Sequence, residues 1–209
     1  MPRGVPLSPA EDIAPLIRAL CDANADTRER AAVEIFRRGR ELANSATAAW
    51  FLDAELATFY VRDRGGVPEL TVGVAVQPET FQKIRTACGA PPLANVPPDQ
   101  DASEFELEFP GGARLDVLTS SQPESNGAIA RFLRKSGEAI QQVEIGVTDV
   151  TRLTELLRAR SGVSPIYPVT RGGADGTRVN FFLAPAGGDR KVLIELVEDP
   201  RRDARATLK

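Results

Sequence analysis

Four polar residues stand at matching places in two halves of this 209-residue sequence. Each lies on a strand-like segment whose apolar residues alternate with other residues, so each points away from the apolar face of its strand. Superposing the halves pairs Thr71 with Gln142 and Asp116 with Glu195. If a pseudo-twofold axis relates the halves, the four side chains converge on one cleft, where such oxygen-bearing groups can transfer protons or hold a hard cation.

A further set of carboxylates lies on the segment Glu104–Phe109, where glutamates alternate strictly with apolar residues. If Phe105, Leu107 and Phe109 face the core, the three glutamates line the opposite, cupped face of the sheet. A glutamate in a cleft can take and return a proton, whereas one on a solvated strand face has no such role. The alternation by itself leaves both interpretations open.

The elements that position these residues form an internal repeat. Leu70–Val76 and Gln141–Val147 are each followed by a helix-like run, and each half then closes with a hairpin over a Gly-Gly turn. These turns lie at Gly111-Gly112 and Gly187-Gly188. Self-similarity of this kind indicates a duplicated structural unit.

An N-terminal helical extension, residues 1–65, is expected before a domain of residues 66–209. Helices are predicted over Pro9–Cys21, behind a Ser-Pro-Ala-Glu capping pattern, and over Thr27–Ala43. A third helix is expected to begin at Ser45, although the segment after it is also compatible with a strand.

Helices this short rarely persist undocked in water, and residues 62–68 are expected to link them to the second domain. Their apolar stripes should therefore pack against each other and the second domain, or across a dimer interface. The stripe residues are Ile13, Leu16, Ile17, Leu20, Ile35 and Phe36.

Composition excludes several classes of protein. A net charge of −3 argues against nucleic-acid binding, which needs a basic surface. No apolar run is long enough to span a membrane, and the first residues lack the apolar region of a secretory signal. Cys21 and Cys88 are too few for a disulfide framework or a thiolate metal site. We therefore expect a cytoplasmic protein.

The sequence resembles the vicinal-oxygen-chelate superfamily, and within it the methylmalonyl-CoA epimerases. The resemblance is best over AIARFLRKSGEAIQQVEIGVTDV, GADGTRVNFFLAP and VLIELVE, and it extends from about Glu69 to Asp199. It implies an α+β fold in which two βαβββ modules, about residues 69–119 and 137–199, form cupped mixed sheets. The glycine-rich segment 171–177 would then border the substrate cleft.

The resemblance also implies a metal site at Thr71, Asp116, Gln142 and Glu195. In the epimerases the first and third of these positions are histidines, and this chain contains no histidine. A hydroxyl, an amide and two carboxylates form a hard oxygen set that suits Mg²⁺, Mn²⁺ or Ca²⁺. Zinc is not expected, because two strong nitrogen donors are missing.

Glu104 and Glu195 match the two acid–base glutamates of the epimerases. The resemblance therefore implies an epimerase or isomerase that acts on an acyl-CoA or a related carbonyl acid, with a homodimer expected. Two other classes stay open. One is a metal-free protein of the same fold that binds a small molecule without catalysis, and the other is an interaction protein that works through its helical extension.

Overall fold

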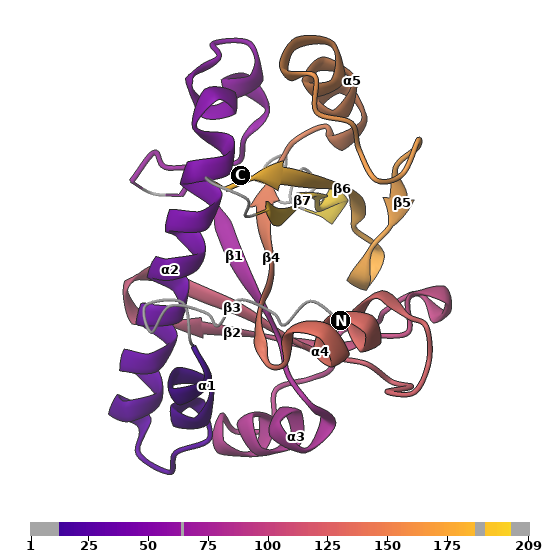
Figure 1. The fold of residues 1–209 in the computed structure, drawn as a ribbon. Helices are drawn as coiled ribbons and strands as arrows, with labels where there is room; N and C mark the ends of the chain where they lie inside the picture. Colours follow the sequence, from indigo (N-terminus) through magenta and orange to yellow (C-terminus); the bar gives the residue numbers. More distant parts are fainter. Residues whose placement is uncertain (1–12, 64, 187–190, 202–209) are drawn as a thin grey trace, which may run out of the picture.

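A curled, mixed seven-stranded sheet organises the fold (Figure 1). The computed structural model describes residues 13–63, 65–186 and 191–201. The strands are β1 Leu70–Ala75, β2 Ser103–Phe109, β3 Ala113–Thr119, β4 Ala139–Gly146, β5 Arg171–Gly172, β6 Arg178–Pro185 and β7 Lys191–Glu198, in the order β2-β3-β1-β4-β7-β6-β5. The central strands β1 and β4 are antiparallel, and each has a parallel outer neighbour, β3 or β7. The predicted α+β fold is confirmed.

The sheet register confirms the superposition of the two halves. Gly73 on β1 lies opposite Asp116 on β3, and Glu144 on β4 lies opposite Glu195 on β7. Gly73 and Glu144 each stand two residues after the paired positions 71 and 142. The two parallel pairs are therefore equivalent, as a duplicated unit requires. The second Gly-Gly turn, at 187–188, lies outside the described residues.

The two modules differ in one strand. Each has a helix after its first strand, α3 Pro78–Ala87 or α5 Val150–Ser161, but only the second module forms a further short strand, β5, before its hairpin. The corresponding stretch of the first module, residues 90–98, contains Pro91, Pro92, Pro97 and Pro98. Proline lacks the amide hydrogen of a sheet ladder, so four prolines in nine residues disfavour a strand there.

The N-terminal extension forms two helices, α1 Ala14–Leu20 and α2 Ala25–Leu52. The predicted break at Ser45 is wrong: α2 continues through it, and the Ser45 hydroxyl donates to the carbonyl of Ala186 at 3.3 Å. The apolar stripe simply continues through Ala43 and Trp50, which are buried against the sheet. The segment that was compatible with a strand is a short 3₁₀ helix, η1 Leu56–Phe59. The predicted start of the first helix at Pro9 lies outside the described residues.

Helix α2 runs beside strands of both modules and packs against them (Figure 1). It contributes to both large core clusters, one over each module. Of the six predicted stripe residues, four are buried and Leu16 and Phe36 are half-buried, so the expected docking is confirmed. Gly39 lets α2 approach β1 closely, because a Cβ there would lie 2.4 Å from Val72 Cγ2.

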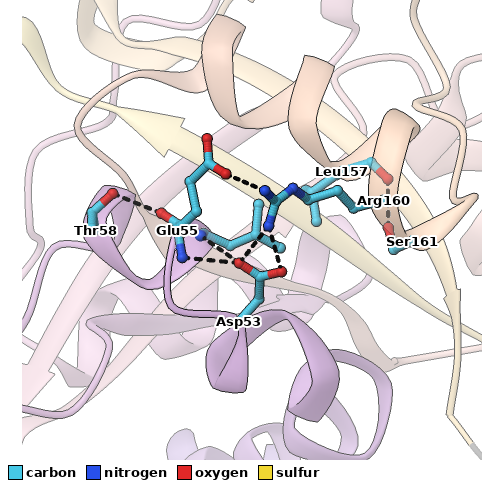
Figure 2. Close-up of polar contacts among 7 residues, drawn as sticks. Asp53, Glu55, Thr58, Leu157, Arg160 and Ser161 are labelled. Atoms are coloured by element: carbon cyan, nitrogen blue, oxygen red, sulfur yellow. Dashed lines mark hydrogen bonds and ion pairs between the residues drawn. The ribbon is translucent and has the colours of Figure 1, made fainter.

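An ion-pair cluster ties the end of the extension to the second module (Figure 2). Arg160 on α5 reaches Asp53 at 2.9 Å and also pairs with Glu55. Asp53 in turn accepts hydrogen bonds from the amides of Glu55 and Leu56. The carboxylate therefore fixes the turn after α2 and holds Arg160 at the same time.

Replacing Arg160 with glutamine should have only a small effect, because the pair is exposed to water. We expect the melting temperature to fall by about 1–2 °C at low salt. In about 1 M salt, where surface charges are screened, the difference should disappear. A fall of about 10 °C that persists in salt would show that the cluster is structurally essential.

Candidate active-site cleft

A cleft of about 470 Å³ opens on the concave face of the sheet. Its floor is formed by residues of β2, β3, β4 and β7. Helix α4, Ala128–Ser136, lies between the modules and packs Ile129 and Leu133 on Ala75 and Leu118. The helix therefore covers part of the concave face and bounds one side of the cleft.

Four carboxyl groups from four strands face this cleft: Glu104, Asp116, Glu144 and Glu195. Asp116 and Glu195 are only 5% and 8% exposed. The amide nitrogen of Gln142 donates to Glu195 Oε2 at 2.5 Å and to Glu144 Oε1 at 3.2 Å. Within the described part of the chain, Asp116 Oδ1 has no hydrogen-bond partner.

The structure brings most of the predicted positions together. Asp116 and Glu195 share the cleft, as the repeat requires, and Gln142 and Glu104 line it as well. Thr71 does not line it: the residue is 9% exposed and lies opposite Glu144 in the sheet. A threonine side chain is too short to extend past a neighbouring glutamate, which explains why only the glutamate reaches the cleft.

Glu144 lines the cleft but was not among the residues that the repeat predicted. Its equivalent in the first module is Gly73, so the two halves do not match in residue type at this position. A Cβ at position 73 would lie 2.5 Å from Gln142 Cγ, so the glycine makes room for that side chain. The alternation of β4 places Glu144 on the same face as Gln142, and this pattern could have indicated from the sequence that Glu144 faces the cleft.

On β2, Glu106 also lines the cleft, whereas Glu108 lines a separate hollow.

Burial and mutual repulsion raise the pKa values of all four carboxyl groups. Burial raises the pKa of Glu104 to about 7, with Asp175 and Glu106 adding to the shift. Burial, then repulsion by Glu104, raises the pKa of Glu144 to about 8. The pKa values of Asp116 and Glu195 are raised mainly by burial, with the neighbouring carboxylates adding to it. The site can therefore hold protonated and ionised carboxyls together near neutral pH.

Loops from opposite edges of the sheet meet over the cleft. In the loop before β2, Asn95 exchanges hydrogen bonds with Asp175, which lies beyond β5: its amide donates to Asp175 Oδ1 at 2.9 Å, and its carbonyl accepts from the Asp175 amide at 3.0 Å. Arg171 pairs with Asp99, and its guanidinium lies 4.6 Å from the centre of the Tyr167 ring. The segment 171–177 therefore borders the cleft, as predicted.

The side chains present do not fit the four-ligand metal centre that the resemblance implies. Thr71 does not line the cleft, and Gln142 turns its amide nitrogen, not its oxygen, toward Glu195. Among the described residues, no group of three or more His, Cys, Asp or Glu side chains is arranged to hold a metal ion.

No helix in these residues is long and apolar enough to cross a membrane.

Comparisons with known proteins identify relatives only among solved structures. No family model matches the chain, and no curated protein matches it. A methylmalonyl-CoA epimerase from Mycobacterium tuberculosis is 32% identical with a TM-score of 0.51, over 64% of this chain and 89% of the epimerase. A hypothetical protein from Bacillus halodurans C-125 is 26% identical with a TM-score of 0.50, over 62% of this chain and 91% of its own. An epimerase in complex with methylmalonyl-CoA and NH4+ has a TM-score of 0.51, over 68% of this chain and 95% of its own, and at 22% identity it shows the fold alone.

Proposed function

Because the chain belongs to the vicinal-oxygen-chelate superfamily and is similar in structure to methylmalonyl-CoA epimerases, we propose that it is an acid–base epimerase or isomerase. The substrate class is an acyl-CoA or a related carbonyl acid. Solved epimerases in complex with methylmalonyl-CoA or with 2-nitronate-propionyl-CoA support a ligand of this size and kind.

One observation carries the proposal: Glu104 and Glu195 face the same cleft from different strands, and both have raised pKa values. Epimerisation beside a carbonyl requires one group to remove the proton from Cα and another to return a proton to the opposite face. With a pKa of about 7, Glu104 is partly ionised at neutral pH and serves as the base. Burial raises the pKa of Glu195 well above its ordinary value and favours its protonated form, so we assign it the role of the acid.

The reaction also needs a group that stabilises the negative charge that develops on the carbonyl oxygen. Because the residues do not fit a metal, we assign this part to hydrogen-bond donors in the cleft. A protonated carboxyl group is one such donor, because both N–H groups of the Gln142 amide already donate to Glu195 and Glu144. A buried carboxylic acid that stays neutral can act in this way, because its proton points at the oxygen where charge accumulates.

Exchange of the Cα hydrogen with solvent tests the proposal directly. The protein is incubated in D₂O with methylmalonyl-CoA and with a panel of other acyl-CoA thioesters and free 2-substituted carbonyl acids. Mass spectrometry then follows deuterium incorporation. We expect catalysed exchange with at least one of these compounds. Tight binding without exchange, unchanged by substitution of Glu104 or Glu195, would instead favour a binding protein without catalysis.

The second candidate function is therefore a metal-free small-molecule-binding protein. The poor fit to a metal centre favours it, because the relatives' electrophile would be missing. The two candidates share the same cleft and differ only in whether the carboxyl groups exchange protons with the ligand.

A metal analysis provides a separate test of the site. Protein purified without added metal should contain much less than one zinc ion per chain, because the cleft offers oxygen donors and no histidine. Elemental analysis before and after mild chelation measures this content. Near-stoichiometric zinc that survives the chelator would contradict the expectation.

A further inference from the structure

The charged residues that line the cleft are mainly acidic. Acidic residues that line it outnumber arginines by eight to three. The arginines have other partners: Arg171 pairs with Asp99, Arg201 pairs with Asp199, and Arg131 donates to a backbone carbonyl. No lysine or arginine within the described ranges forms an ion pair with the four carboxyl groups of the floor.

Asp116 is the floor residue whose bonding is incomplete. It is 95% buried, and its Oδ1 atom has no hydrogen-bond partner among the residues that the structure describes. Burial of a carboxyl oxygen without a partner disfavours the ionised form and raises the pKa of Asp116, whereas a neighbouring positive charge favours the ionised form. Asp116 faces the cleft, so a bound ligand can supply the missing charge.

Two aromatic rings stand on another wall of the same cleft. Tyr167 and Phe181 pack edge to face with centroids 6.0 Å apart, and both line the cleft. The stack of Arg171 on Tyr167 shows that this ring already accepts a cation. An apolar or aromatic ligand body fits against these rings, while an attached cationic group fits against the floor.

We propose that the cleft binds a small molecule that carries a protonated amine, with the ammonium group against Asp116 and the apolar part against Tyr167 and Phe181. Three observations carry this inference: the uncompensated acidic floor, the unpartnered carboxylate oxygen and the aromatic wall. It goes beyond the proposed catalytic function, because an amine binds in this way whether or not the carboxyl groups also transfer protons; for the proposed reaction it implies a substrate whose acyl group carries an amine.

Three compounds of one shape test the proposal: 3-phenylpropylamine, 3-phenylpropanol and 3-phenylpropanoate. Their affinities for the full chain are measured by titration calorimetry or ligand-observed NMR at pH 8 with a chelator present. We expect the amine to bind at least about tenfold more tightly than the alcohol, and the carboxylate to bind most weakly. Equal affinities, or preference for the carboxylate, would overturn the proposal.

Matched variants locate the ammonium group. Asp116→Asn keeps the shape of the side chain and removes its charge, so amine affinity should fall about tenfold while alcohol affinity is unchanged. Tyr167→Leu removes a ring from the apolar wall and should weaken the amine and the alcohol alike, by about threefold. Glu108→Gln removes a charge from β2 outside the cleft and should have less than about a twofold effect. If Asp116→Asn binds the amine normally, the proposed ammonium site is wrong.

Discussion

Replacing Glu104 with glutamine should slow exchange of the substrate Cα hydrogen by a factor of about 10²–10⁴. Glutamine keeps the size of the side chain but cannot accept the proton, and loss of a general base typically costs this much. The measurement is the initial rate of deuterium incorporation at saturating substrate. Glu108→Gln, on the same strand but outside the cleft, is the matched control and should exchange at the wild-type rate.

The pH dependence gives this prediction a second readout. The base must be ionised, so the wild-type rate should rise with pH and reach half its maximum near the Glu104 pKa of about 7. Stability has the opposite dependence: a carboxyl whose pKa is raised on folding destabilises the protein as pH rises from its ordinary value of 4.5 through about 7. Glu104→Gln removes this cost and should be at least as stable as wild type at pH 8. A folded variant with wild-type exchange would exclude Glu104 as the base.

Replacing Ile17 with aspartate should destabilise the protein by about 3–5 kcal/mol, because the change places an unpaired charge in a fully buried contact. Ile17 is 0% exposed and lies in the cluster that joins α1 and α2 to the first module. For a chain of this length, the melting temperature should fall by about 10 °C or more. Thermal unfolding followed by circular dichroism measures the change, and light scattering reports the oligomeric state.

An exposed position on α2 supplies the control for this experiment. Val33 is 43% exposed, so Val33→Asp adds the same charge to the extension without burying it. Its melting temperature should stay within about 2 °C of wild type. If Ile17→Asp melts like Val33→Asp, with unchanged mass, the extension is only loosely attached and its docking on the sheet does not stabilise the fold.

The internal repeat explains why so much of the fold could be predicted. Alternation along β1 and β4 identifies which side chains point away from the core, and duplication relates Asp116 to Glu195 across nearly eighty residues of sequence. Both are local properties of strands, because side chains alternate with a period of two whatever the surroundings. The apolar stripes of the two N-terminal helices are local in the same sense, and burial of Ile17 and Ile35 followed from them.

Prediction was wrong where the outcome depended on neighbours that are distant in sequence. The pattern around Ser45 suggested a new helix, but α2 continues because Ala43 and Trp50 find apolar partners on the sheet. Packing of this kind adds more free energy to a helix than local propensity does. The stretch from 90 to 98 illustrates the reverse case, in which a local feature, its four prolines, disfavours a strand in one module.

Sequence by itself determined the repeat, the core face of the strands that it predicted, and the place of three of the four repeat-related polar residues in the cleft. Only the tertiary structure decided that Thr71 does not line the cleft and that Glu144 does. It alone brought Asn95 to Asp175 from opposite edges of the sheet. The physical reason is that alternation fixes which face a side chain occupies, whereas its reach, its cross-strand neighbours and the curl of the sheet decide what it contacts there.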